Sequence, residues 1–248
     1  MEKQLSQPLK IAIIGHGKMG KTIEALALSA SCQVVFIGSK DWFQHRESFI
    51  ASGAEIAIEF TSPESAPNNI LKLIDLGIPT VCGSTGWTNK EHEVKTACLS
   101  ANGSVLLGSN FSVGVHLFFA LNKKLAKWMA NFPEYSVRIK EIHHTEKKDA
   151  PSGTAVTAAK GIIELNPSFS DWALQGENET KGIIPILALR QEEVKGFHSI
   201  TWNSAIDQLE LQHSAHSREG FALGALRAAH WLYGKQGWFG VEDMYAFE

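Results

Sequence analysis

Fifteen consecutive residues, EIHHTEKKDAPSGTA (141–155), bring titratable, cationic and helix-capping side chains together in the middle of the chain. Histidine exchanges a proton near neutral pH, so His143 or His144 could act as an acid or a base. Lys147 offers a positive charge that can stabilise an anionic substrate or negative charge that develops during a reaction. The segment therefore predicts proton transfer to an anionic small molecule.

The same segment ends in a turn that should begin a helix. Pro151 and Ser152 precede the helix-forming run AVTAAKGIIEL, and serine is a favoured N-cap residue. Ser152, Gly153 and Thr154 would then place free backbone N–H groups and hydroxyls at the positive end of a helix dipole. Such an end binds anions, so we expect a carboxylate site here.

Other interpretations of these residues exist. His143, His144 and Asp149 are residue types that bind metals, but adjacent strand residues point to opposite faces, so the two histidines should not converge easily. In a purely structural interpretation, one histidine is buried, one is exposed, and the lysine pair is solvated. We expect no metal site.

A second chemical pattern lies near the N-terminus. Gly15, Gly17 and Gly20 match G-x-G-x-x-G between a strand-like run at 11–14 and the helix-like KTIEALALSA. In dinucleotide-binding proteins these glycines allow a tight turn, a close approach to pyrophosphate and close packing of helix and strand. The context favours a nicotinamide dinucleotide over a merely structural turn.

The end of the second predicted strand bears on the choice of cofactor. The strand CQVVFIG lacks an acidic residue at its end, where NAD-specific proteins bind the ribose hydroxyls. Ser39 and Lys40 stand there instead, and Lys18 lies in the glycine loop, which suits a 2′-phosphate. Asp41 leaves NAD possible, so the expected cofactor is NADPH or NADH.

The elements that must position these residues change in character along the chain. Strand-like and helix-like runs alternate up to residue 112, and the strand ends are rich in Gly, Ser, Thr and Asn, as in a parallel α/β sheet. After that come an amphipathic helix (116–132), an alternating strand (135–144), a loop-like stretch (165–182), an antiparallel strand pair (197–215), and finally a helix with a Gly-containing turn and a short tail (217–245). We predict an N-terminal Rossmann-like parallel-sheet domain and a C-terminal α+β mixed-sheet domain.

Composition excludes several classes of protein. The 248 residues are 44% hydrophobic with a formal net charge of −3, so no basic surface for nucleic acid or an anionic membrane is expected. No signal-like or membrane-spanning apolar run is present, so we expect a cytoplasmic protein. Cys32, Cys82 and Cys98 lack the spacing of a zinc site or a disulfide framework and are expected to be buried thiols.

These motifs together resemble the dihydrodipicolinate reductase family. Residues 141–155 match its signature E-x-H-H-x-x-K-x-D-A-P-S-G-T-A throughout, and shorter matches are GHGKMGK (15–21), EFTSP (59–63), GSTG (83–86), NFSVGV (110–115) and HSAHSREGFALGAL (213–226). The glycine loop is one residue shorter than in many members. Glu59 and Ser84 also stand where Asp and Thr are commoner.

The resemblance implies an activity and an organisation. The expected reaction is NAD(P)H-dependent reduction of (2S,4S)-4-hydroxy-2,3,4,5-tetrahydrodipicolinate, with loss of water, in lysine and diaminopimelate biosynthesis. A nucleotide domain at 1–112, completed by 217–248, and a substrate-binding and tetramerisation domain at 113–216 would form a homotetramer.

The resemblance also implies roles for particular residues. His143 and Lys147 would be catalytic, and which of them delivers the proton stays open. The substrate would be bound by His144, Ser152, Gly153, Thr154 and Thr85. The cofactor would be bound by Gly15, His16, Gly17, Lys18, Met19, Gly20, Ser39, Lys40, Phe60, Gly83, Ser84, Thr85, Asn110 and Phe111.

Two other functions would also account for part of these sequence features. A non-catalytic NAD(P)-sensing protein would share the glycine motif but would need neither a proton donor nor a carboxylate site. Another Rossmann-type oxidoreductase, acting on aspartate or an aldehyde, is the second alternative. The aldehyde reaction needs a nucleophilic cysteine, for which Cys82 is the candidate, although its apolar neighbours suggest a core thiol.

Overall fold

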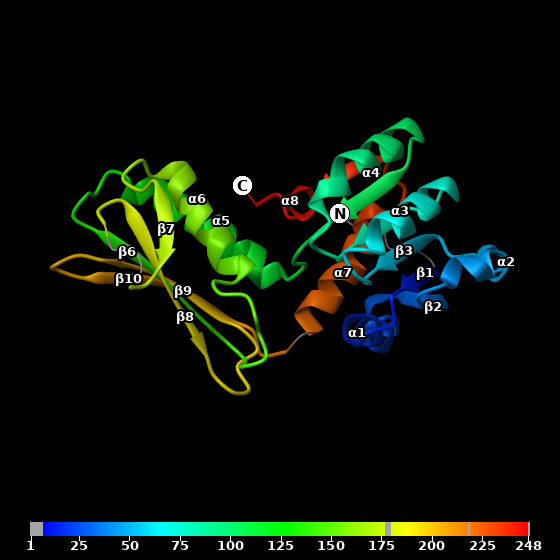
Figure 1. The fold of residues 1–248 in the computed structure, drawn as a ribbon, viewed down its shortest axis with the longest axis horizontal. Helices are drawn as coiled ribbons and strands as arrows, with labels where there is room; N and C mark the ends of the chain where they lie inside the picture. The colour runs from blue at the N-terminus through cyan, green and yellow to red at the C-terminus, as the bar shows by residue number, and fades with distance from the viewer. Residues whose placement is uncertain (1–6, 177–179, 218, 248) are drawn as a thin grey trace. The chain divides into compact units, whose positions relative to one another are not determined.

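The computed structural model describes residues 7–176, 180–217 and 219–247. The described residues form two compact units, of which the first contains 7–113 and 219–246, and the second contains 114–176, 180–217 and Phe247. The C-terminal part of the chain, red in Figure 1, thus returns to the unit formed by the N-terminal part.

The first unit is built on a six-stranded sheet in which every pair of neighbouring strands is parallel. In the order β11-β5-β4-β3-β1-β2, the strands are Gly237–Gly240, Ser104–Leu107, Thr80–Cys82, Ile56–Glu59, Leu9–Ile14 and Cys32–Gly38. The inner strands are short apolar runs, as a sheet covered on both faces requires. The predicted Rossmann-like domain is confirmed.

Helices cover both faces of this sheet. They are α1 (Lys18–Leu26), α2 (Arg46–Ala51), α3 (Ala66–Asp75), α4 (Thr88–Ser100), α7 (Glu219–Leu232) and α8 (Val241–Met244), with the 3₁₀ helices η1 (Leu28–Ala30) and η2 (Trp42–His45). One core joins Ile23 of α1 and Ala225 of α7 to the sheet, and another joins Ile70 of α3 and Val94 of α4 to it. Within the described residues, no helix is long and apolar enough to cross a lipid bilayer.

The second unit is a mixed five-stranded sheet with two helices. In the order β10-β9-β6-β8-β7, its strands are Gln208–Ser214, Phe197–Asn203, Ser136–His143, Ile183–Arg190 and Asp171–Leu174, and its helices are α5 (Val113–Met129) and α6 (Gly153–Leu165). Ile139, Ile186 and Ile200 lie opposite one another on the three central strands and are fully or almost fully buried. The predicted mixed-sheet domain and its antiparallel pair, β9 and β10, are confirmed.

Two sequence predictions of irregular structure are wrong in part. The stretch 165–182, predicted as a loop, contains β7, an edge strand whose four residues are at most half-buried and so lack a clear apolar pattern. Residues 177–179 of that stretch lie outside the described residues. The predicted C-terminal tail contains β11, which pairs with β5 at the edge of the first sheet.

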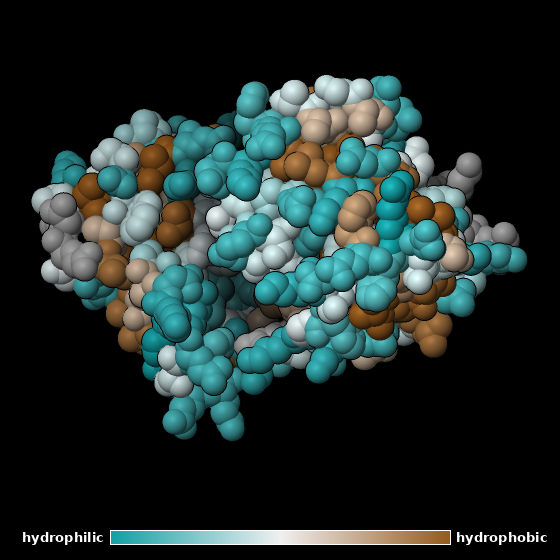
Figure 2. Space-filling view, turned by 45° about the vertical axis from the view of Figure 1, so that its right-hand side comes forward, coloured by the Kyte–Doolittle hydropathy of each residue, from teal (hydrophilic) through white to brown (hydrophobic). Residues whose placement is uncertain are grey.

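The face shown in Figure 2 is mostly hydrophilic, with separate hydrophobic patches. Exposed apolar side chains include Ile206, Leu28 and Trp128. Such dispersed exposure is ordinary for a globular protein.

Candidate active site

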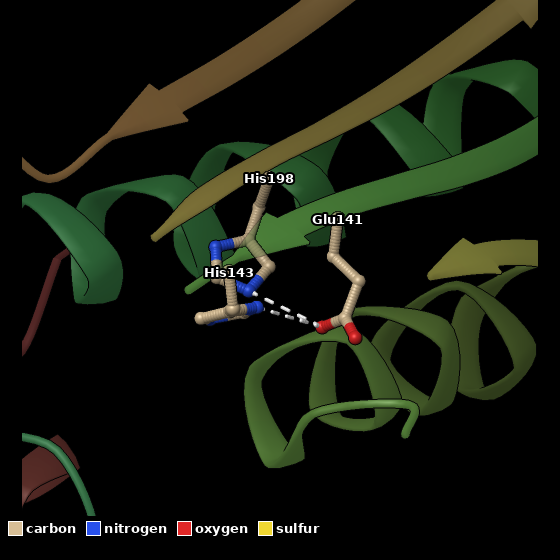
Figure 3. A group of neighbouring side chains, drawn as sticks. All are labelled: Glu141, His143 and His198. Carbon is tan, nitrogen blue, oxygen red and sulfur yellow. Dashed lines mark ion pairs between the residues drawn. The ribbon is translucent and has the colours of Figure 1, made fainter. Parts of the chain in front are cut away.

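The site in the second unit is organised by the inner face of β6. Val137 and Ile139 on this face belong to the apolar core, and the same alternation carries Glu141 and His143 inward at the end of the strand. Across the sheet, Glu141 pairs with His198 of β9, and His143 pairs with Arg190 of β8. Because residues directly opposite one another point to the same face, these polar side chains meet, and Figure 3 shows three of them, Glu141, His143 and His198.

Glu141 lies at the centre of this cluster and is completely buried. Its two carboxylate oxygens accept the backbone N–H of Ser152 at 3.1 and 3.0 Å, and Arg190 Nη1 lies 3.4 Å from Oε1. Nδ1 of His143 and Nε2 of His198 lie 3.6 and 3.7 Å from Oε2. A buried carboxylate is costly unless donors surround it, and here donors approach from four residues.

His143 is buried beside the Glu141 carboxylate. Burial lowers the pKa of its ring, while the nearby Glu141 carboxylate opposes this shift. Nδ1 lies 3.6 Å from the carboxylate, too far for a hydrogen bond, but the negative charge still favours a proton on this nitrogen of the neutral ring, which leaves Nε2 to exchange a proton. A Cβ atom at Gly196 would lie 3.4 Å from this Nε2, so the glycine limits crowding there.

Lys147 lies on the loop between β6 and α6. Its Nζ donates to both carboxylate oxygens of Asp149 at 2.9 Å, and this bond lowers the pKa of Asp149. Arg190 donates to the carbonyl groups of Lys147 and Asp149, which ties the loop to β8. The Asp149 side chain is 59% exposed, so this ion pair is weak and a substrate anion can replace Asp149 as the partner of Lys147.

Helix α6 begins as predicted, with Ser152 as its N-cap. The buried Ser152 Oγ accepts the N–H of Ala155 at 3.2 Å. The backbone N–H of Ser152, expected to be free, instead donates to Glu141. Gly153 is exposed and a Cβ there would meet nothing within 4 Å, while Thr154 is half-buried. The N–H groups of Gly153 and Thr154 remain at the helix N-terminus to bind an anion.

The cluster has the residue types of a metal site, but a positively charged arginine already lies beside its carboxylate. Among the described residues, one group of possible metal ligands has its ligand atoms within 4.8 Å of one another, and it consists of Glu141, His143 and His198. This group differs from the set of His143, His144 and Asp149 that the sequence suggested. Arg190 and the Ser152 N–H already occupy the carboxylate. This arrangement favours a hydrogen-bonded anchor over a cation site.

Three residues of the cluster were not identified from the sequence: Glu141, Arg190 and His198. Strand alternation could have identified Glu141, since it lies two positions before His143. Arg190 and His198 become neighbours only through the pairing of β8 and β9 with β6, which local sequence does not encode. His144 follows the end of β6 and is half-buried.

The glycine turn of the first unit fits a dinucleotide. Gly15 has a φ of 101°, and a Cβ there would clash with the Phe60 backbone, while a Cβ at Gly20 would clash with the Gly15 carbonyl. Gly17, the N-cap of α1, has nothing within 4 Å of a Cβ position, and no side chain caps this helix. The turn is therefore tight on its inner side, and its outer side leaves the helix N-terminus open to a phosphate.

Strand β2 ends beside this turn. The N–H of Gly15 donates to the Gly38 carbonyl at 2.9 Å, and the exposed Ser39 and Lys40 follow directly. Lys18 begins α1, and His16 forms a 2.7 Å hydrogen bond with Glu24. Cations thus lie near the place where the adenosine ribose is expected.

The remaining cofactor candidates also lie in the first unit. Phe60 packs against Phe111 at 6.0 Å between ring centroids and against Gly83, and Met19 packs on the core. Ser84 Oγ accepts the N–H of Thr61 at 2.8 Å, and Asn110 Oδ1 accepts that of Ser112 at 2.8 Å. Thr85, assigned to both cofactor and substrate, is exposed.

Glu59 is part of a buried polar network. This fully buried residue contacts the Thr61 hydroxyl, the Asn69 amide at 3.3 Å and the Cys82 thiol at 3.3 Å. Burial and the neighbouring carboxylate raise the pKa of Cys82 well above its usual value. Cys82 therefore lacks the thiolate character that an aldehyde-oxidising enzyme needs.

The chain matches known proteins over most of its length. The family models "Dihydrodipicolinate reductase, N-terminus" and "Dihydrodipicolinate reductase, C-terminus" match residues 9–111 and 114–245. The chain is 41% identical over 236 residues to the 4-hydroxy-tetrahydrodipicolinate reductase of Christiangramia forsetii, covering 95% of this chain and 97% of that protein. It is 31% identical over 259 residues to that of Methanoregula boonei, covering 96% and 98%.

Solved structures share the fold. A dipicolinate-bound dihydrodipicolinate reductase from Paenisporosarcina sp. TG-14 has a TM-score of 0.75 at 20% identity, covering 96% of this chain and 100% of that one. An amine dehydrogenase from Mycobacterium smegmatis has a TM-score of 0.62 at 9% identity, covering 98% and 97%. The family models and the near full-length relatives show that this chain belongs to the dihydrodipicolinate reductase family, NAD(P)H-dependent oxidoreductases of lysine and diaminopimelate biosynthesis.

Proposed function

We propose that this chain reduces 4-hydroxy-tetrahydrodipicolinate with NAD(P)H, and that the end of β6 and the start of α6 bind the substrate and supply its proton. This assignment rests on the junction between the end of β6 and the start of α6. The proton carrier His143 and the N-cap Ser152 are held by the same buried carboxylate, Glu141. A proton donor and an anion site are thereby fixed relative to each other.

The substrate is a dianion, and the junction offers a matching set of donors. The N–H groups of Gly153 and Thr154, together with the hydroxyls of Ser152 and Thr154, suit one carboxylate. His144 and Lys147 add further donors at the loop. The dihydrodipicolinate reductase from Paenisporosarcina sp. TG-14 was solved with bound dipicolinate, a ring dicarboxylate, which supports this type of ligand.

The chemistry divides between the cofactor and the protein. The hydroxyl group of the substrate leaves as water together with a hydrogen from an adjacent ring carbon, and NAD(P)H, when bound, supplies a hydride to the resulting unsaturated ring. The ring must gain a proton as electron density builds on an atom next to the carbon that is reduced. Lys147 stabilises this negative charge, and His143, when it is protonated at Nε2, delivers the proton from that nitrogen.

The cofactor is bound by the first unit. The open N-terminus of α1 and the turn at Gly17 suit the pyrophosphate. Ser39 and Lys40, assisted by Lys18, can donate to a 2′-phosphate, so NADPH should serve at least as well as NADH. Asp41 is the residue that could instead accept the ribose hydroxyls of NADH.

The assembly we propose is a homotetramer formed through the second unit. Its support is the family resemblance. A cytoplasmic location stays a prediction. The buried free thiols of Cys32, Cys82 and Cys98 fit a reducing compartment.

The direct experiment mixes the purified protein with NADPH and freshly prepared 4-hydroxy-tetrahydrodipicolinate and follows the absorbance of the reduced nicotinamide. We expect oxidation of NADPH that depends on both the substrate and the protein. Aspartate and an aldehyde, tested in the oxidative direction with NADP⁺, should give no turnover. Turnover of either compound without turnover of the ring substrate would favour the alternative oxidoreductases.

A further inference from the structure

His198 lies on β9, and its side chain contacts Ser152 at the proposed anion site. The residue is 5% exposed, and its ring packs against those of His143 and Phe118, with centroids 5.0 and 6.5 Å away. Nε2 lies 3.2 Å from Ser152 Oγ and 3.7 Å from Glu141 Oε2 (Figure 3 shows the second pair). Nδ1 is buried and meets no hydrogen-bonding group of the described chain.

The surroundings determine which ring nitrogen carries a proton. Burial lowers the pKa of His198 to about 3, so the ring is neutral in a neutral solution and has one N–H group. A proton on Nδ1 would leave a buried donor without a partner and would turn the Nε2 lone pair toward the Glu141 carboxylate. A proton on Nε2 instead faces the Ser152 hydroxyl oxygen at hydrogen-bond distance and the negative charge of Glu141 slightly further away. The favoured form is therefore the one with Nε2–H.

The Nε2–H form of His198 determines whether the Ser152 hydroxyl donates or accepts a further hydrogen bond. A hydroxyl oxygen accepts two hydrogen bonds and donates one. Ser152 Oγ accepts the N–H of Ala155 at 3.2 Å, and Nε2–H of His198 is the second donor at 3.2 Å. With both lone pairs engaged, the hydroxyl proton remains to donate, and a substrate carboxylate at the α6 N-terminus accepts it.

We propose that His198 is a positioning residue for substrate binding, which acts by holding the Ser152 hydroxyl as a hydrogen-bond donor to a substrate carboxylate. The inference rests on the proposed function, because it takes the anion site at α6 as given. Glu141 and His198 then have complementary effects on Ser152. Glu141 engages its backbone N–H, and His198 directs its hydroxyl.

A role through Ser152 differs from a role in packing, and a double-mutant cycle separates them. The probe is pyridine-2,6-dicarboxylate, and its Kd is measured by calorimetry for the parent, His198→Leu, Ser152→Ala and the double variant. A hydrogen bond to a charged group is worth enough that each single change should weaken binding roughly 10-fold. The double variant should bind no more weakly than Ser152→Ala, because His198 has lost the group through which it acts.

The matched control is His198→Gln, whose side-chain amide can present an N–H near the position of Nε2. It should bind the probe within about threefold of the parent, whereas His198→Leu should not. The Kd for NADPH reports on the first unit and should be unchanged in every variant. Should His198→Leu not fold, His198→Asn replaces it, because its shorter amide does not reach Ser152 and should weaken binding as Leu would.

The outcomes separate this inference from the proposed function. Failure of the parent to bind the dicarboxylate would overturn both. Binding by the parent with multiplicative losses in the double variant, or with equal losses in the Gln and Leu variants, would overturn the role of His198 alone.

Discussion

The two helix N-termini that we assign to ligands are built in opposite ways. Helix α1 starts at Gly17, which has no side chain, and no other side chain caps it. Helix α6 starts at Ser152, which is bonded to Ala155, Glu141 and His198. A bare terminus suits a phosphate that is bound but not altered. A terminus fixed by titratable groups suits a substrate that must be protonated at a particular atom.

The largest effect that this comparison predicts is on catalysis. His143→Ala and Lys147→Ala should each lower kcat about 10²- to 10⁴-fold, the usual loss for a positioned acid or its supporting charge. Both residues lie in the second unit, so the Kd for NADPH, measured by fluorescence titration, should be unchanged. Normal turnover in both variants would remove the catalytic assignment.

The second effect is on the cofactor alone. Gly17→Ala places a methyl group where the first unit has open space, so the fold should persist while pyrophosphate is held further away. We expect KM for NADPH to rise about 10-fold, which corresponds to a loss of roughly 1.4 kcal/mol. The Kd for pyridine-2,6-dicarboxylate alone should stay the same.

Gly15→Ala is the structural counterpart of that change. Its φ of 101° and the close Phe60 backbone make any side chain strained, so the protein should lose about 1–3 kcal/mol of stability in urea unfolding. An equal loss of stability in the Gly17 variant would contradict our division between the inner and outer sides of the turn.

The third effect is a pH dependence of stability that arises in the second unit, at His198. The pKa of His198 falls from 6.5 to about 3 in the folded protein, so below pH 6.5 the unfolded chain binds a proton that the folded chain does not. This contribution to stability is therefore complete above pH 6.5 and decreases as the pH falls toward 3. Between pH 7.5 and 5.5 the loss should be about 1 kcal/mol.

The measurement is urea unfolding of the parent and His198→Gln at both pH values. The difference between the two proteins cancels the contributions of His143, His213 and the carboxylates to a first approximation. Parallel pH dependence in both proteins would mean that His198 is not held neutral in the folded state.

The smallest effect concerns the exposed end of β2. Lys40→Ala should reduce any preference for NADPH over NADH by no more than about fivefold, because an exposed ion pair contributes only about 0.2–1 kcal/mol. The preference of the parent should also decrease as salt is added. The comparison is kcat/KM for both cofactors at low and high ionic strength, and a salt-independent preference for NADH in both proteins would assign the ribose to Asp41.

Much of this site could be predicted because its parts are local in sequence. The alternation in YSVRIKEIHH predicted a strand that ends at the histidine pair, and Pro-Ser-Gly-Thr predicted the start of α6. The partners that fix these parts could not be predicted. Arg190 and His198 arrive through the strand order β9-β6-β8, and β11 is a strand only because it pairs with β5.

The central claim is that the α6 terminus binds the substrate dianion while the α1 terminus binds the cofactor. It is tested most directly by steady-state inhibition with pyridine-2,6-dicarboxylate, varying the concentrations of substrate and NADPH in turn. We predict competitive inhibition against 4-hydroxy-tetrahydrodipicolinate and no competition with NADPH. Inhibition that is competitive with NADPH alone would contradict the claim, because it would place the dicarboxylate at the nucleotide site.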